Sequence, residues 1–216
     1  MKKIFTKENL KKFFNTYIWL MVLLFVIDIV TKWVVFNHFG KEQMISGVDK
    51  DNGGIQIIKN FIYIGGAINP YAAYSFHLFK GELANRISYA SISIIMTGAF
   101  IAYFIIKYKS LKTVEKISLA LMIAGGFGNL IDRVFYWNNT VGFSGVIDWI
   151  QFYVGGNPIF GSFNIADASL VVGIIVLIIE IIVEEVKESI EKGKRGEYKY
   201  SPEELKEKEN EGNKSN

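Results

Sequence analysis

Four long apolar stretches divide the chain, at residues 17–36, 87–106, 117–136 and about 163–183. Each has close to the roughly 20 residues that an α-helix needs to cross the hydrocarbon core of a bilayer. The pattern predicts an all-α membrane protein with four transmembrane helices. The first stretch contains Asp28 and is not followed by a small-residue cleavage pattern, so we expect a retained anchor rather than a signal peptide.

The connections between these stretches differ in length and character. Residues 37–86 are too many for a turn, and the run GIQIIKNFIYIGG (residues 54–66) is rich in Ile, Phe and Tyr between glycines. This composition favours a strand or hairpin, so we expect a small extracytoplasmic β-sheet segment within about residues 38–80. Between the last two helices, residues 137–162 are expected to form a short extracytoplasmic segment.

The distribution of basic residues predicts the orientation. Residues 2–12 hold five lysines and one Glu, residues 107–116 hold four lysines and one Glu, and residues 134–186 hold no basic residue. Because short cytoplasmic segments are enriched in Lys and Arg, both termini and the 107–116 connection are predicted to be cytoplasmic. The chain then divides into a basic cytoplasmic N-terminus, one four-helix domain and a charged, disordered cytoplasmic tail, at residues 1–16, 17–185 and 186–216.

The polar residues of the apolar helices gather at one depth. At about 1.5 Å per helical residue, all of them lie near the outer boundary of the bilayer. They are Asp28 and Lys32 in the first helix, Asn129, Asp132 and Arg133 in the third, and Asn164 and Asp167 in the fourth. A charge at membrane depth costs on the order of 2.5–3.5 kcal/mol, so such residues usually pair inside the bundle.

Two of these groups have a purely structural interpretation. Asp28 and Lys32 are four residues apart, with the acid first, and this spacing favours a structural ion pair over a catalytic one. Asp132 and Arg133 are neighbours in the chain and fit an interfacial anchor, in which we expect Arg133 to hold the Asp132 carboxylate ionised.

The composition limits the chemistry to carboxylates and amides. There is no cysteine, which excludes disulfides and thiol nucleophiles, and the two histidines, His38 and His77, disfavour a His-based relay or a multi-His metal site. Two aspartates, Asp148 and Asp167, are expected on the outer side, on mobile or helix-end backbone. Taken alone, Asp148 fits a turn residue, and Asp167 with Asn164 fits a helix N-terminal cap.

As a pair, the same two aspartates fit hydrolysis. Carboxyl groups held within a few ångströms of each other cannot easily ionise together, so one of them keeps a proton. The ionised member can then activate a water against a peptide carbonyl, while the protonated member donates to the developing oxyanion. The protons of such a pair titrate as a property of both groups.

Four motifs in order resemble lipoprotein signal peptidase (signal peptidase II). They are DIVTK (28–32), GGFGNLIDR (125–133), GVIDW (145–149) and FNIAD (163–167). The resemblance covers roughly residues 17–185. It implies an intramembrane aspartic peptidase of the bacterial plasma membrane that cuts the signal peptide of a prolipoprotein just before the lipid-modified cysteine.

The resemblance also implies roles for individual residues. Asp148 and Asp167 match the catalytic aspartates. Substrate binding or support of the site would fall to Asn69, Asn129, Asp132, Arg133, Asn164, Asp28 and Lys32, with Asp132 holding Arg133. The implied partners are lipid-modified prolipoproteins, membrane lipid and globomycin-like inhibitors. No metal, other cofactor or nucleic acid is expected.

The outer segments carry one departure from the family and one hypothesis. The stretch INPYAAYSF (68–76) places Tyr71 where the family usually has glycine, which changes the local loop shape. Aromatic residues of the second outer segment suit the membrane interface and could cover the substrate as a lid. They are Trp137, Trp149, Phe152 and Tyr153.

Two other functions would use the same residues differently. A small transporter or channel subunit would spread its polar residues through the bilayer, whereas residues 87–106 hold no charge. A membrane scaffold without enzymatic activity would tolerate the substitutions Asp148→Asn and Asp167→Asn.

Overall fold

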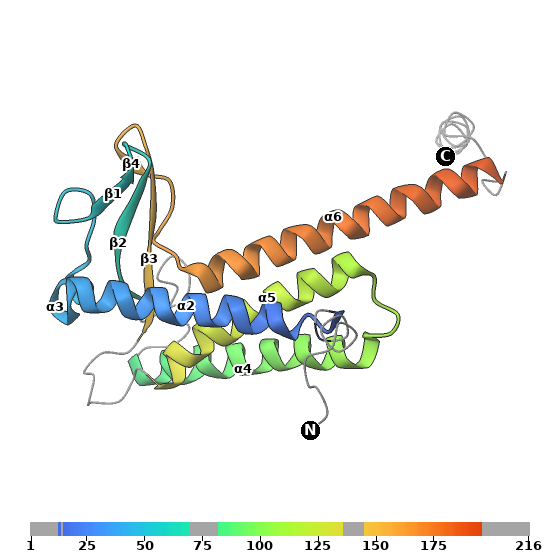
Figure 1. The fold of residues 1–216 in the computed structure, drawn as a ribbon, viewed down its shortest axis with the longest axis horizontal. Helices are drawn as coiled ribbons and strands as arrows, with labels where there is room; N and C mark the ends of the chain where they lie inside the picture. Colours follow the sequence, from blue (N-terminus) through green and yellow to red (C-terminus); the bar gives the residue numbers. More distant parts are fainter. Residues whose placement is uncertain (1–12, 14, 70–81, 136–144, 196–216) are drawn as a thin grey trace, which may run out of the picture. The chain divides into compact units, whose positions relative to one another are not determined.

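The structure is a computed structural model that describes residue 13 and residues 15–69, 82–135 and 145–195 (Figure 1). Its elements are α2 (Ile18–Phe39), α3 (Lys41–Ser46), β1 (Ile55–Ile58), β2 (Ile62–Asn69), α4 (Glu82–Lys107), α5 (Thr113–Phe135), β3 (Val146–Val154), β4 (Asn157–Pro158) and α6 (Ile165–Lys194). Helices α2, α4, α5 and α6 are long and apolar enough to cross a membrane. The predicted fold class, four spans with a small sheet, is confirmed.

Helix α5 packs against the other three spans. Half of its apolar window is buried, against 17% for each of the others. A Cβ added at Gly125 would lie 2.3 Å from a backbone oxygen of α6, and one at Gly126 would lie 2.3 Å from Thr97 Oγ1 of α4. A Cβ at Gly128 would lie 2.5 Å from Asp28 Oδ2 of α2. The glycines of α5 therefore allow close approach of neighbouring helices.

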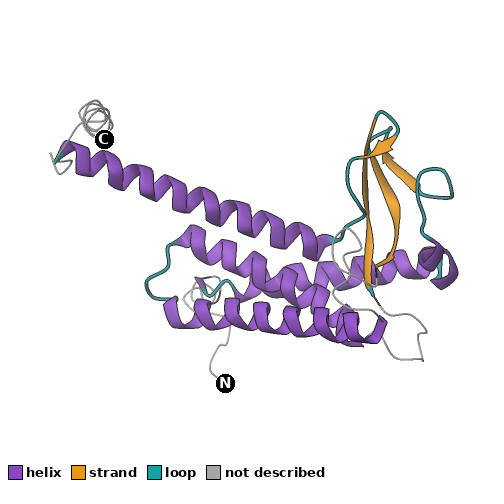
Figure 2. Ribbon diagram, turned by 180° about the vertical axis from the view of Figure 1, so that it is seen from behind, coloured by secondary structure: helices purple, strands orange, loops and turns teal. Residues whose placement is uncertain are grey.

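The strands form one antiparallel sheet in the order β1-β2-β3-β4. The hairpin of β1 and β2 confirms the strand prediction for residues 54–66. Strand β3 was not predicted: the short segment expected between the last two helices supplies the strand that pairs with β2. Figure 2 shows the sheet standing across one end of the helices. The two segments that connect α2 to α4 and α5 to α6 thus build one sheet.

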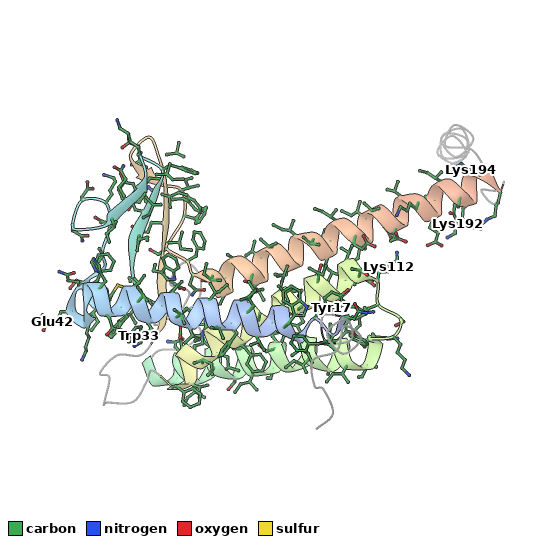
Figure 3. All side chains as sticks on the ribbon, viewed as in Figure 1. Tyr17, Trp33, Glu42, Lys112, Lys192 and Lys194 are labelled. Atoms are coloured by element: carbon green, nitrogen blue, oxygen red, sulfur yellow. The ribbon has the colours of Figure 1, made fainter. Side chains whose placement is uncertain are left out.

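Different apolar clusters hold the two ends of the molecule. At the sheet end, α2, α3 and the sheet share a buried cluster of Val35, Met44, Val48, Ile68 and Ile147. The short helix α3 was also not predicted. At the other end, α4, α5 and their connection share Phe104, Leu111, Leu119, Met122 and Ile123. In Figure 3, Trp33 and Glu42 mark the sheet end, whereas Tyr17 and Lys112 mark the opposite end.

Helix α6 continues further than the sequence pattern indicated. Residues 178–216 form a separate compact unit, of which residues 178–195 are described. Two ion pairs support the helix to Lys194: Lys187 with Glu184 (3.1 Å) and Lys192 with Glu188 (2.6 Å). In each pair the two residues are about one helical turn apart. The first residues of the expected tail, from 186 on, are therefore helical. Residues 196–216 lie outside the described part, and their disorder stays a prediction.

Candidate active site

Asp148 lies on strand β3, opposite Ala67 of β2. We expected mobile or helix-end backbone there, and the structure corrects this, because the residue belongs to a paired strand. The register of β2 against β3 shifts between Ile64 and Ala67. In this interval Gly66 has φ +95°, and a Cβ there would lie 1.9 Å from the Asp148 carbonyl oxygen. Only glycine lets β2 approach the backbone of Asp148 this closely.

Asp167 lies in the first turn of α6, directly after the cap formed by Asn164. The Asp167 N–H donates to Asn164 Oδ1 (2.8 Å), and the Asn164 N–H donates to Asp167 Oδ2 (3.2 Å). These reciprocal bonds form a capping box, so the helix-cap interpretation of the two residues is correct. It is also incomplete, because Asn164 Nδ2 donates to Asp148 Oδ1 at 2.8 Å. Asn164 therefore contacts both aspartates.

Two further amides complete the hydrogen bonds of the pair. Asn69 Nδ2 donates to Asp148 Oδ2 at 3.0 Å, and Asn129 Nδ2 donates to Asp167 Oδ1 at 2.7 Å. Asn129 Oδ1 in turn accepts a bond from Asn164 Nδ2 at 3.0 Å. Three asparagines from three separate segments thus link the carboxyl groups of Asp148 and Asp167 into one network.

The electrostatic setting of Asp148 favours its protonated form. The side chain is 5% exposed, and this burial, with the negative charge of Asp167 as the next cause, raises the pKa of Asp148 from 3.8 to about 8. Hydrogen bonds from Asn69 and Asn164 and the charge of Lys32 oppose the shift. Burial and the neighbouring charge thus both favour a proton on Asp148 near neutral pH.

Asp28 and Lys32 form the predicted ion pair, with 2.7 Å between Asp28 Oδ2 and Lys32 Nζ. The expected pairing of Asp132 with Arg133 is wrong: Asp132 Oδ2 lies 2.8 Å from Lys32 Nζ. Consecutive helix residues point in different directions, so Asp132 and Arg133 cannot share one face. The Arg133 Nη1 donates instead to Ser93 Oγ (3.3 Å) and to a backbone oxygen of α5 (3.4 Å).

Arg133 lies close to the aspartate pair. The negative charges that act most strongly on its guanidinium are those of Asp167 and then Asp148. Among the described residues, Nη1 is the one guanidinium nitrogen with a hydrogen bond. Nε and Nη2 are therefore available to a ligand within the field of the two carboxyl groups.

The aromatic residues expected to form a lid are partly used in packing. Trp149 packs against the apolar cluster at the sheet end, and Tyr153 is buried with its ring centroid 5.1 Å from that of Tyr63. Phe152 stacks on Phe163 at 5.4 Å. Trp149 and Tyr153 thus contribute to the packing of the sheet, and their role as a lid stays a prediction. Trp137, Tyr71 and His77 lie outside the described residues.

The described part of the chain contains no group of three or more His, Cys, Asp or Glu residues that could hold a metal ion. The structure brings the predicted residues Asn69, Asn129, Asp148, Asn164 and Asp167 into one hydrogen-bond network, and their roles stay a prediction. What the sequence missed is Ser93 of α4, which contacts Arg133. Ser93 is one of several hydroxyl residues on this uncharged span, so the sequence alone did not single it out. The fold and the site together define a membrane protein in which asparagines link a buried aspartate, Asp148, to a half-buried one, Asp167, at the sheet end of four helices.

Comparisons with known proteins assign the chain to one family. The family model for signal peptidase (SPase) II matches residues 20–183, and the chain belongs to that family. A lipoprotein signal peptidase of Listeria monocytogenes is 31% identical over 172 residues, 79% of this chain and 96% of the relative. One of Listeria welshimeri is 32% identical over the same shares, and one of Syntrophus aciditrophicus is 28% identical over 77% of this chain and 92% of its own.

Solved structures agree with the sequence relatives. A structure described as a bacterial membrane enzyme, solved by the in meso method at 2.3 Å resolution, has a TM-score of 0.60 and 28% identity. The match covers 79% of this chain and 89% of that one. A second, at 1.9 Å, has a TM-score of 0.54 over 77% of this chain and 92% of its own. The chain is therefore a bacterial membrane peptidase of lipoprotein signal peptides.

Proposed function

We propose that the chain is an aspartic endopeptidase that uses Asp148, Asp167 and water to cut prolipoproteins before their lipid-modified cysteine. The observation that carries this proposal is the position of Asn164, whose side-chain amide donates to Asp148 while its backbone and side chain cap Asp167. One residue thereby holds two carboxyl groups from different elements beside each other. Family membership supplies the signal peptide as substrate.

The two carboxyl groups divide the work of hydrolysis. Asp167, ionised, accepts a proton from water as the water oxygen adds to the peptide carbonyl carbon. Asp148 gives its proton to the carbonyl oxygen, which produces a neutral tetrahedral diol. As the C–N bond breaks, the amine leaving group takes the proton from Asp167, and a diol hydroxyl returns one to Asp148. Each proton is thus accounted for, and the pair returns to its starting state.

Neighbouring polar groups are arranged to bind the peptide backbone. Arg133 has guanidinium N–H groups beside the pair, and these can donate to a substrate carbonyl. Asn129 and Asn69 hold the two carboxyl groups, so their main role is orientation of Asp167 and Asp148. A globomycin-like inhibitor would occupy the same donors.

The proposed location is the outer face of the bacterial plasma membrane, with both termini in the cytoplasm. The lysines of residues 2–12 and 107–116 support this orientation. Of these, Lys112 lies at the end of the spans away from the sheet (Figure 3). The aspartate pair then lies at the lipid boundary of the outer leaflet. Acyl chains on the cysteine would hold the adjacent peptide bond at that depth, among membrane lipids.

A cleavage assay with two matched peptides tests the proposal. The purified chain in lipid vesicles would be given a precursor peptide whose cysteine carries a diacylglyceryl group, and the same peptide with a free cysteine. We expect cleavage of the first, directly before the cysteine, and little of the second. Equal cleavage of both peptides, or cleavage elsewhere in the peptide, would contradict the assigned substrate.

A further inference from the structure

Lys32, Asp28 and Asp132 form a buried ion triad that joins α2 to α5. Lys32 Nζ is 2.7 Å from Asp28 Oδ2 and 2.8 Å from Asp132 Oδ2, and all three residues are at most 1% exposed. Burying three charges is costly, and apolar residues of similar volume often stabilise a protein equally well. The proposed hydrolysis routes no proton through Lys32, so the triad needs another explanation.

Each carboxylate of the triad also holds the backbone next to one catalytic aspartate. Asp28 Oδ1 accepts the N–H of Ala166 at 2.8 Å, one residue before Asp167. Asp132 Oδ2 accepts the N–H of Ile147 at 3.3 Å, one residue before Asp148. Asp28 and Asp132 thus make the same kind of contact: each carboxylate accepts the backbone N–H of the residue that precedes one aspartate of the pair. We call these two contacts the arms of the triad.

The Lys32 ammonium group contacts both carboxylates and so connects the two arms. The N-terminal turn of α6 is tied to α2 through Asp28, strand β3 is tied to α5 through Asp132, and Lys32 joins the two carboxylates. A change at this ammonium group therefore acts on α6 and β3 together. Both contacts are charge-assisted and buried, so their geometry is well defined.

We propose that Lys32 is a positioning residue that sets the spacing between the Asp148 and Asp167 carboxyl groups by holding Asp28 and Asp132 together. This inference rests on the proposed function of the aspartate pair. It assigns Lys32 a role beyond a local ion pair of α2. Displacements of about 1 Å in a catalytic constellation can lower a rate by about a hundredfold.

A third contact of Lys32 orients an amide of the site. Lys32 Nζ donates to Asn129 Oδ1 at 3.3 Å. An ammonium group has only donors, so it selects the amide orientation in which oxygen faces Lys32. The Nδ2 group of Asn129 is then directed to Asp167 Oδ1. Loss of Lys32 would thus disturb Asp167 through Asn129 as well as through α6.

The first test replaces Lys32 with an apolar side chain of similar length. For Lys32→Met in lipid vesicles we expect kcat to fall by about a hundredfold per folded molecule, with KM changed by less than about twofold. Lys187→Met is the matched control, because Lys187 is an exposed, ion-paired lysine far along α6, and its kcat should equal that of the wild type. An unchanged kcat in folded Lys32→Met would overturn the proposal.

A triple variant covers the case in which two unpaired carboxylates prevent folding. In Asp28→Asn/Lys32→Met/Asp132→Asn the triad is neutral, and each amide oxygen can still accept the backbone N–H that the carboxylate held. The arms remain and only their link is lost. We expect a folded protein with the same loss of kcat; wild-type turnover in this variant would contradict the positioning role.

A distance measurement separates this inference from the proposed function. The chain has no cysteine, so Val154→Cys on β3 and Val171→Cys on α6 give a unique spin-label pair at exposed positions. We expect a narrow distance distribution with Lys32 and a broader or shifted one in the triple variant. An identical distribution would overturn the proposal. If the wild type cleaves no lipidated peptide, the proposed function fails, and this measurement still decides the role of Lys32.

Discussion

The two ends of the helical bundle are joined by different kinds of contact. At the end that carries Tyr17 and Lys112, α4 and α5 meet through apolar side chains such as Phe104 and Leu119. At the sheet end, the same α5 meets α2, the start of α6 and β3 through one lysine, two aspartates and two asparagines, which are Lys32, Asp132, Asp167, Asn129 and Asn164. The apolar contacts are non-directional, whereas the polar ones require defined distances and angles.

This difference suggests that the apolar end mainly stabilises the fold, whereas the sheet end fixes the positions of the two carboxyl groups. Apolar packing tolerates exchanges that keep volume, so the end around Leu119 contributes stability without fixing a single arrangement. The sheet end places two carboxyl groups and their donors to within hydrogen-bond tolerance. We therefore expect substitutions at the sheet end to lower turnover, and substitutions at the apolar end to lower the free energy of unfolding.

The largest effect is expected from removing either carboxyl group. In Asp148→Asn and Asp167→Asn the side chains keep their shape but lose the acid–base function, and turnover should fall by about three orders of magnitude or more. The measurement is cleavage of the lipidated peptide per folded molecule. Asp51→Asn, an exposed aspartate of the sheet end, is the matched control and should retain wild-type turnover. Comparable activity in all three variants would leave the pair without a catalytic role.

The next effect tests the amide link within the pair. Asn164→Ser keeps a side-chain oxygen that can cap α6, but removes the Nδ2 donor to Asp148 and Asn129. We expect kcat to fall by about a hundredfold, while the unfolding temperature changes little. If the unfolding temperature drops and kcat per folded molecule stays constant, Asn164 is a cap and nothing more.

The effect of pH follows from the raised pKa of Asp148, about 8. Because the reaction needs the protonated acid, the rate should fall by about tenfold per pH unit above that value. The folded state also binds this proton more tightly than the unfolded chain, whose pKa is near 3.8. Raising the pH from about 4 to about 8 therefore lowers the free energy of unfolding, and the slope should be smaller in Asp148→Asn than in the wild type.

The smallest effect on turnover is expected at the apolar end. Leu119 is 3% exposed, and Leu119→Ala should lower the free energy of unfolding by about 2–5 kcal/mol through loss of buried surface and formation of a cavity. The kcat of the folded fraction should remain that of the wild type. A fall in kcat as large as that of Asn164→Ser would show that the two ends are not independent.

Much of this organisation could be predicted from the chain. Hydropathy located the four spans, and the depth of Asp28, Asn129 and Asp167 along their helices indicated a common site. Local rules also predicted the ion pair of Asp28 with Lys32 and the capping role of Asn164. Each of these predictions depends on neighbours within one helix or on the length of an apolar stretch.

Contacts between distant segments could not be predicted in the same way. Strand β3 pairs with β2 across about eighty residues of chain. The run between Gly145 and Gly155, rich in Val, Ile and aromatic residues, was a strand signal, but it did not indicate the partner strand. The partner of Asp132 depends on which residue α2 presents to α5, and that residue is Lys32. Sequence adjacency suggested Arg133, but adjacent helix positions do not face each other.

The central claim is that Asp148 carries a proton at neutral pH beside Asp167. Infrared spectroscopy of the purified protein in lipid tests this directly, by following the carboxylic acid band of Asp148 during a pH titration. The account predicts a band at pH 7 that is absent in Asp148→Asn, persists in Leu119→Ala and disappears above about pH 8. A band assigned to Asp148 that is already lost at pH 5 would contradict the account.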